Sequence, residues 1–98
     1  MQSSLADMKD LLKNYHFYKI QAKNGLGGDC LQKKLAFLEN SISVLNEEDN
    51  KLIKSIYIDG VPVVKAAKSL YLHRATIYRK IDAIIENLAK VYEIMFLA

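Results

Sequence analysis

The most informative segment of the sequence is Val63-Val64-Lys65-Ala66-Ala67-Lys68-Ser69-Leu70-Tyr71-Leu72-His73-Arg74-Ala75-Thr76-Ile77-Tyr78-Arg79-Lys80-Ile81. Apolar residues recur at helical spacing on both sides of Leu72: Ala66, Ala67 and Leu70 before it, Ile77 and Ile81 after it. Ala67 is small, which allows the second helix to cross the first closely. The stretch therefore predicts a helix-turn-helix, two helices that close over one small core.

Positive charge is concentrated in the same stretch. It holds five cations and no acidic residue, whereas the rest of the chain carries nine basic and eleven acidic residues and sums to −2. The formal net charge of +3 therefore comes entirely from the helix-turn-helix. Such a local excess suits a phosphate backbone, because neutralised phosphates release condensed counterions. A solvated lysine-rich helix face is the alternative explanation, and the spacing of the motif favours nucleic acid over it.

The length and composition predict one small helical protein. Ninety-eight residues allow one modest core, and only four Gly and one Pro interrupt a sequence that is 51% hydrophobic. Apolar runs fall short of the ~20 residues that span a bilayer, and the N-terminus lacks a secretion signal, so we expect no membrane contact and a cytoplasmic location. The single Cys30 excludes an internal disulfide, and we expect it to be a buried or half-buried thiol.

Signs of an enzyme, a metal site or a cofactor site are missing from the sequence. The two histidines, His16 and His73, do not join Cys30 or carboxylates at metal-ligand spacing. The carboxylates concentrate at predicted helix starts, and no Gly-rich phosphate loop is present. We therefore predict a non-enzymatic protein without a cofactor.

Residues 1–45 are predicted to form an N-terminal helical hairpin. A first helix should begin at Ser4 and reach about Lys23, where a glycine-containing loop over 24–28 ends it, and Asp29 should cap the next helix. The second helix carries a seam with alternating spacings of four and three residues: Leu31, Leu35, Leu38, Ile42 and Leu45. This seam fits an intramolecular hairpin core, and pairing with a second copy of the chain is the alternative.

Residues 46–98 are predicted to form a three-helix unit that contains the motif. Asn46, followed by three acidic residues, should cap a helix that ends at Asp59-Gly60. Pro62 fits the first turn of the next helix, about 61–70, and a last helix should run from His73 or Arg74 to Met95. That last helix is about 33 Å long, more than its neighbours in the unit can cover. Its distal half supplies further candidates for a dimer interface: Leu88, Val91 and Met95.

Inward-facing Ile77 and Ile81 determine which side chains of the last helix point outward. If its N-terminal turns enter a major groove, the candidates for reading bases are Arg74, Ala75, Tyr78 and Arg79, because an arginine can donate two hydrogen bonds to guanine. Asp82 should mark the turn at which the helix leaves the groove. Candidates for contact with the DNA backbone are Lys65, Lys68, His73, Thr76 and Lys80. Alternatives are packing on the hairpin for Tyr78 and a capping or turn role for His73.

The chain from Leu45 to about Tyr92 resembles the region 4 helix-turn-helix of sigma factors. The elements that match are an acidic helix start over 45–49, a helix ending in 57–60, Ala66-Ala67 followed by Leu70, and the run 74–81. With the helical arm ahead of it, the whole chain resembles small phage-type (ArpU/RinA-like) transcriptional regulators of Gram-positive bacteria. The resemblance implies promoter or operator binding. Two positions depart from the pattern: Tyr71 stands where the turn usually has Gly, and His73 where Ser, Thr or Asp usually caps the recognition helix.

These observations predict an all-α protein that binds double-stranded DNA as a sequence-specific transcriptional regulator. We expect a homodimer, since two-fold pairing doubles both contacts and specificity. Two alternatives stay open at this point. One is a sigma-like module that binds RNA polymerase, and the other is a helical dimerisation or anti-regulator protein that does not bind nucleic acid.

Overall fold

The computed structural model describes residues 4–97, and this part of the chain is all-α, as predicted. The elements are α1 (Ser4–Lys13), α2 (Tyr15–Lys23), α3 (Gly28–Ser43), α4 (Glu47–Ile53) with the π-helical turn η1 (Lys54–Ile58), α5 (Val63–Leu70), and α6 (Arg74–Tyr92) with the π-helical turn η2 (Glu93–Leu97). Residues 4–97 contain no strand. Within the same range, no helix is long and apolar enough to cross a membrane.

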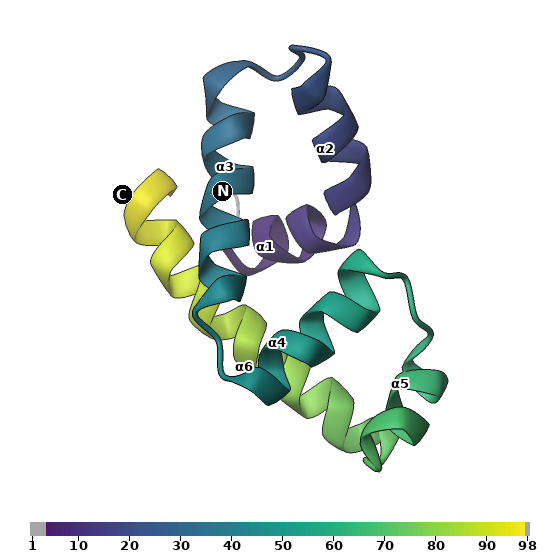
Figure 1. The fold of residues 1–98 in the computed structure, drawn as a ribbon. Helices are drawn as coiled ribbons and strands as arrows, with labels where there is room; N and C mark the ends of the chain where they lie inside the picture. The colour runs from purple at the N-terminus through teal and green to yellow at the C-terminus, as the bar shows by residue number, and fades with distance from the viewer. Residues whose placement is uncertain (1–3, 98) are drawn as a thin grey trace.

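The long helix α6 organises the molecule (Figure 1). It packs on α1, α4 and α5 along its length, and α2 and α3 form a hairpin at one end of the molecule. The helix-turn-helix of α5 and the start of α6 lies at the opposite end from the loop between α2 and α3. Helix α6 begins in the helix-turn-helix and ends beside α3. This one helix therefore connects the motif to the N-terminal helices. The division at residue 45 into an arm and a DNA-binding unit stays a prediction.

The predicted first helix is wrong in one respect, because the chain breaks at Asn14 and forms two helices. Asn14 has φ −109° and ψ 25°, and its side-chain amide donates to the Asp10 carboxylate at 2.8 Å. The break allows the two halves to pack on different partners. Met8, Leu11 and Leu12 of α1 are buried, mainly against α6, whereas α2 lies on α3. One straight helix could not reach both.

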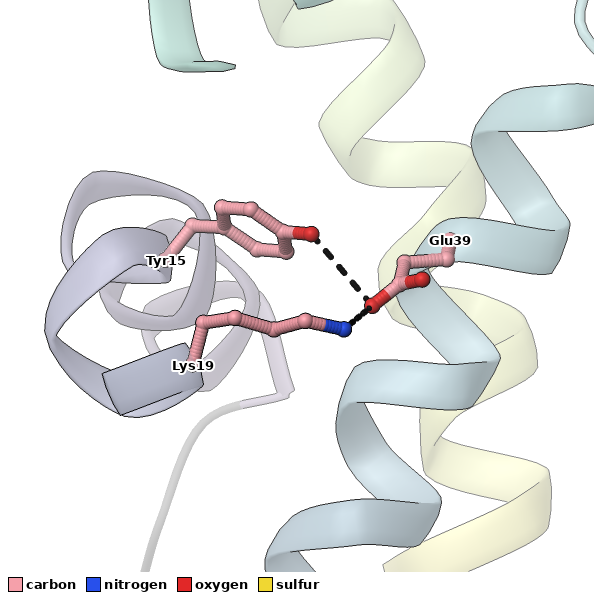
Figure 2. A network of polar contacts seen from close by, with 3 residues as sticks. All are labelled: Tyr15, Lys19 and Glu39. Atoms are coloured by element: carbon pink, nitrogen blue, oxygen red, sulfur yellow. Dashed lines mark hydrogen bonds and ion pairs between the residues drawn. The ribbon is translucent and has the colours of Figure 1, made fainter. Parts of the chain in front are cut away.

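The hairpin of α2 and α3 is held by a polar network (Figure 2). The Tyr15 hydroxyl and the Lys19 ammonium of α2 both donate to one oxygen of the Glu39 carboxylate on α3, at 3.3 and 2.6 Å. Burial raises the pKa of Tyr15, with a further contribution from Glu39, and the hydrogen bond to Glu39 raises the pKa of Lys19.

The loop before α3 ends in Gly27 at φ 80°, where a Cβ would lie 2.5 Å from Leu31 Cδ2. Both the backbone conformation and the close approach of Leu31 therefore favour glycine at this position.

Two local predictions in this region need correction. The Asp29 side chain does not cap α3, because the helix begins at Gly28, two residues earlier than expected, and Asp29 lies inside its first turn. The thiol of Cys30 is exposed instead of buried, because Cys30 lies in the first turn of α3, beside the loop and away from the buried seam.

The seam of α3 belongs to the hydrophobic core. Leu35, Leu38 and Ile42 are buried, and Leu31 and Leu45 are partly buried against the same cluster. Phe37 adds an aromatic group with Tyr92 and Phe96, whose ring centroids lie 5.0–6.0 Å apart. The hairpin prediction is therefore confirmed for this seam, which is satisfied within one chain.

The start of α4 agrees with the sequence prediction. The Asn46 side-chain oxygen accepts the backbone N–H of Asp49 at 2.8 Å, and three acidic residues lie in the first turn. The helix continues through η1 and ends before Asp59-Gly60, as predicted. Pro62, however, precedes α5 with ψ 146° instead of lying in its first turn. The α-helical part of α6 ends at Tyr92, and η2 continues past the predicted end at Met95.

Candidate nucleic-acid interface

The helix-turn-helix is built on small and branched side chains. Ala66 and Ala67 of α5 are buried, and so are Ile77 and Ile81 of α6. The absence of bulk at both alanines permits α5 and α6 to approach closely, as expected from the sequence. Because Ile77 and Ile81 point into the core, Tyr78 and Arg79 between them point to the surface.

The turn between the two helices has a left-handed residue at Tyr71. Its φ is 56° and its ψ 40°, the only positive φ among the non-glycine residues that the structure describes. The Leu72 N–H donates to the Ala67 carbonyl at 2.9 Å and the Tyr71 N–H donates to the Lys68 carbonyl at 3.4 Å. This pair of bonds is a Schellman motif, which usually has glycine at the left-handed position. The backbone thus adopts the strained arrangement, although the side chain is not glycine.

Helix α6 begins without a side-chain cap. His73 has the extended backbone of an N-cap, with φ −74° and ψ 149°, but its imidazole makes no capping hydrogen bond. The first turn of α6 holds Arg74 and no acidic residue. The unpaired N–H groups of the first turn and the Arg74 charge therefore lie together at the positive end of the helix, an arrangement that favours an anion.

The candidates for reading bases are all exposed: Arg74, Ala75, Tyr78 and Arg79. The Tyr78 side chain is 55% exposed and is not among the residues that pack against the core, which argues against the alternative that it packs on the hairpin. The ion pairs of residues 4–97 do not include Arg74 or Arg79. One and two turns further along the same face, Asp82 and Glu86 are exposed as well. On this face of α6 the cationic side chains are therefore confined to the first two turns, and Lys90 lies in the last turn.

The candidates for backbone contacts differ in exposure and in ion pairing. Lys65, Lys68 and His73 are exposed, and the two lysines have no ion-pair partner within residues 4–97. Thr76 is half-buried. Lys80 differs from the sequence expectation, because its ammonium pairs with Glu48 of α4 at 2.9 Å. The hydrogen bond to Glu48 raises the pKa of Lys80. Glu48 partly neutralises the Lys80 charge, so Lys80 is not a principal candidate for contact with a phosphate.

The dimerisation candidates are divided by burial. Four of them are buried in the core of one chain, which corrects their assignment to a dimer interface: Leu35, Leu38, Ile42 and Leu88. Leu31 is partly buried against the same core. Val91 and Met95 are exposed, and with Phe37 and Val44 they line a shallow groove of about 330 Å³ between α3 and the end of α6.

Two exposed apolar residues, one in the lining of this groove and one on η2, were not predicted. Val44 is 82% exposed and Ile94 is 73% exposed. Ile94 could have been found from the sequence, since it follows Val91 by three residues on the same helical face. Val44 could not, because its position beside α6 depends on how the α3 helix packs. We call the exposed residues Val44, Val91, Ile94 and Met95 the distal apolar patch.

The chain was compared with protein-family models, with curated proteins and with solved structures, and none of them matches it.

Proposed function

We propose that this protein is a sequence-specific DNA-binding transcriptional regulator that inserts the first two turns of α6 into the major groove. One observation carries the proposal. Arg74, Tyr78 and Arg79 stand exposed on the first turns of α6, and neither arginine has an ion-pair partner within residues 4–97. An arginine without an internal partner keeps all its donors for a ligand, and a guanidinium matches guanine O6 and N7.

The surrounding charges fit the same orientation. Lys68 on α5 shares a surface groove with His73 and Arg74 at the start of α6, and Lys65 and Lys68, both exposed, would contact phosphates beside the DNA major groove. The N-terminus of α6 adds its partial positive charge. Asp82 and Glu86 are repelled by phosphate, so they limit the inserted length to about two turns. This distribution gives α6 a defined direction of entry, N-terminus first.

We propose further that two chains pair through the distal apolar patch. The patch combines a projecting row on α6 with the adjacent groove beside Phe37, and a two-fold axis can place the row of each chain in the groove of its partner. The distance along α6 from Arg74 to Val91 is about 26 Å at 1.5 Å per residue. In the dimer the two α6 helices would meet at the interface, and their N-termini would have to lie about 34 Å apart to reach neighbouring half-sites. Two arms of about 26 Å span that distance when the angle between the α6 axes is roughly 80°.

The resemblance to sigma region 4 and to phage-type regulators supports the same proposal at the level of the motif. It also supplies the rival function, a module that binds RNA polymerase. The two differ in what the purified chain does alone: a regulator of the proposed kind binds DNA without polymerase.

The test is selection of bound fragments from a random DNA pool with the purified full chain. We expect enrichment of an inverted repeat whose half-sites lie about one helical turn apart. Gel retardation of the selected duplex should weaken linearly in log K against log salt, because counterion release drives binding. Failure to enrich any sequence and to retard DNA at low salt would refute the proposal. Retardation that occurs only after addition of RNA polymerase would favour the rival function.

A further inference from the structure

The backbone conformation of Tyr71 lowers the stability of the fold, and its side chain makes no contact that offsets this loss. It occupies the left-handed position of the turn after α5, at φ 56°. For a residue with a Cβ this conformation is strained, and glycine avoids the strain. The turn itself is fixed by the backbone bonds from Leu72 and Tyr71 to α5, so the strain cannot relax without breaking the motif.

The side chain of Tyr71 makes no compensating contact. It is 95% exposed, more than any other large exposed apolar or aromatic side chain of residues 4–97. Within those residues its hydroxyl has no hydrogen-bond partner and its ring has no aromatic neighbour. A fully solvated tyrosine at a position suited to glycine contributes nothing to folding that glycine would not.

The surroundings of Tyr71 are cationic. Tyr71 lines an open groove of about 480 Å³ between α5 and the start of α6, together with Val64, Lys68, His73 and Arg74. Lys68 and Arg74 stand on the two sides of the turn and are exposed. A phenol that projects between two cations, at the edge of a helix N-terminus, can lie against a sugar and donate its hydroxyl hydrogen to a phosphate oxygen.

We propose that Tyr71 contacts the DNA backbone at the border of the major groove, with its ring against a deoxyribose and its hydroxyl on a phosphate, and so sets how deeply α6 enters. This inference rests on the proposed function. A backbone contact carries no sequence information, so Tyr71 should contribute equally to the binding of any duplex.

The test compares Tyr71→Gly, Tyr71→Asn and Tyr71→Phe for binding to a fluorescent duplex of random sequence at low salt, and for thermal unfolding. Glycine and asparagine both tolerate the left-handed conformation, so both variants fold. We expect Tyr71→Gly to raise Tm by about 4 °C, because it relieves the strain. We expect both variants to bind roughly tenfold more weakly, and Tyr71→Phe about fivefold more weakly through loss of the hydroxyl. The control Phe17→Ala removes an exposed aromatic from α2 and should leave binding unchanged.

If Tyr71 had only a structural role, Tyr71→Gly would change Tm and DNA affinity in the same direction. If Tyr71 contacts DNA, the same variant raises Tm and lowers the affinity. Wild-type affinity in Tyr71→Gly and Tyr71→Asn would overturn this inference and leave the proposed function standing. Wild-type affinity in Tyr71→Phe alone would overturn the phosphate hydrogen bond. Absence of DNA binding by the unaltered chain would overturn the proposed function, and the role of Tyr71 with it.

Discussion

Replacing Arg74 and Arg79 together by alanine separates the proposed contacts from the fold. Each arginine that donates two hydrogen bonds to a guanine contributes about 1–3 kcal/mol of discrimination. If both act in this way, the double variant loses about 2–6 kcal/mol, which is a weakening of roughly 30-fold to 10⁴-fold for the selected site. Specific binding typically exceeds non-specific binding by about 10³–10⁷-fold, so this loss would remove much of the sequence preference.

The stability of the double variant should change little, and the structure predicts the sign of the change. Both side chains are exposed and unpaired, so their removal leaves no cavity and no orphaned partner. Arg74 is the first residue of α6, where a cation opposes the helix dipole by about 0.3–1 kcal/mol. Its removal should therefore keep Tm unchanged or raise it by a few degrees, on the order of 4 °C per kcal/mol.

The assay is fluorescence anisotropy on the selected duplex and on a scrambled duplex, with Lys23→Ala/Lys33→Ala as the matched control. The control removes the same charge from exposed residues of α2 and α3, near the loop at the opposite end of the molecule. We expect its affinity to stay within about twofold of the unaltered chain, because charges beyond a Debye length of about 10 Å are screened. Equal losses in the two double variants, or preserved preference for the selected duplex in the arginine variant, would refute the reasoning.

Three further changes test the fold and the assembly. Asn46→Ala should lower the free energy of unfolding by about 1 kcal/mol in urea titrations, because it deletes the N-cap of α4; no change would show that the cap contributes nothing. The pKa values of Tyr15 and Lys19 are raised in the folded protein above their ordinary values of 10.0 and 10.5. Their contribution to the free energy of unfolding should therefore be fully present below those ordinary values and be lost as pH rises through the raised ones. Glu39→Gln should flatten this alkaline decline in pH-dependent urea titrations, and an unchanged slope would contradict the network of Figure 2. Light scattering at micromolar concentration should give twice the 11.2 kDa chain mass, and Met95→Lys should give the single-chain mass because it places a charge in the interface; a monomeric unaltered chain would refute pairing.

Local patterns were sufficient to predict several features of the structure. The helix-turn-helix and the inward face of α6 follow from the spacing of apolar residues, which depends only on helical geometry. The cap at Asn46 follows from side-chain chemistry within four residues of the chain. The positions of Arg74 and Arg79 on the outside follow from the inward direction of Ile77 and Ile81.

Features that depend on distant neighbours could not be predicted in this way. The periodic pattern of Leu5 to Tyr18 is continuous, and the break at Asn14 arises because α1 and α2 pack on different helices. The seam of α3 showed which face is buried but not whether its partner belongs to the same chain. Likewise, Lys80 looked available for phosphate until the packing of α4 brought Glu48 within 2.9 Å.

Three departures from favourable local choices lie at one edge of the molecule. Tyr71 holds a strained backbone with a solvated ring, His73 starts α6 without capping it, and Arg74 places a cation at the positive end of the same helix. Each choice lowers stability, and the three residues are nearly consecutive. The missing cap is not particular to α6, because α2, α3 and α5 also begin without a side-chain capping bond, whereas a left-handed residue other than glycine occurs only at Tyr71 within residues 4–97. Sequences tend to depart from favourable local choices where function requires it, and strained backbone clusters at such places. A polyanion bound at this edge would stabilise Arg74 and occupy the uncapped N–H groups, and it would give Tyr71 the contact that the fold does not provide.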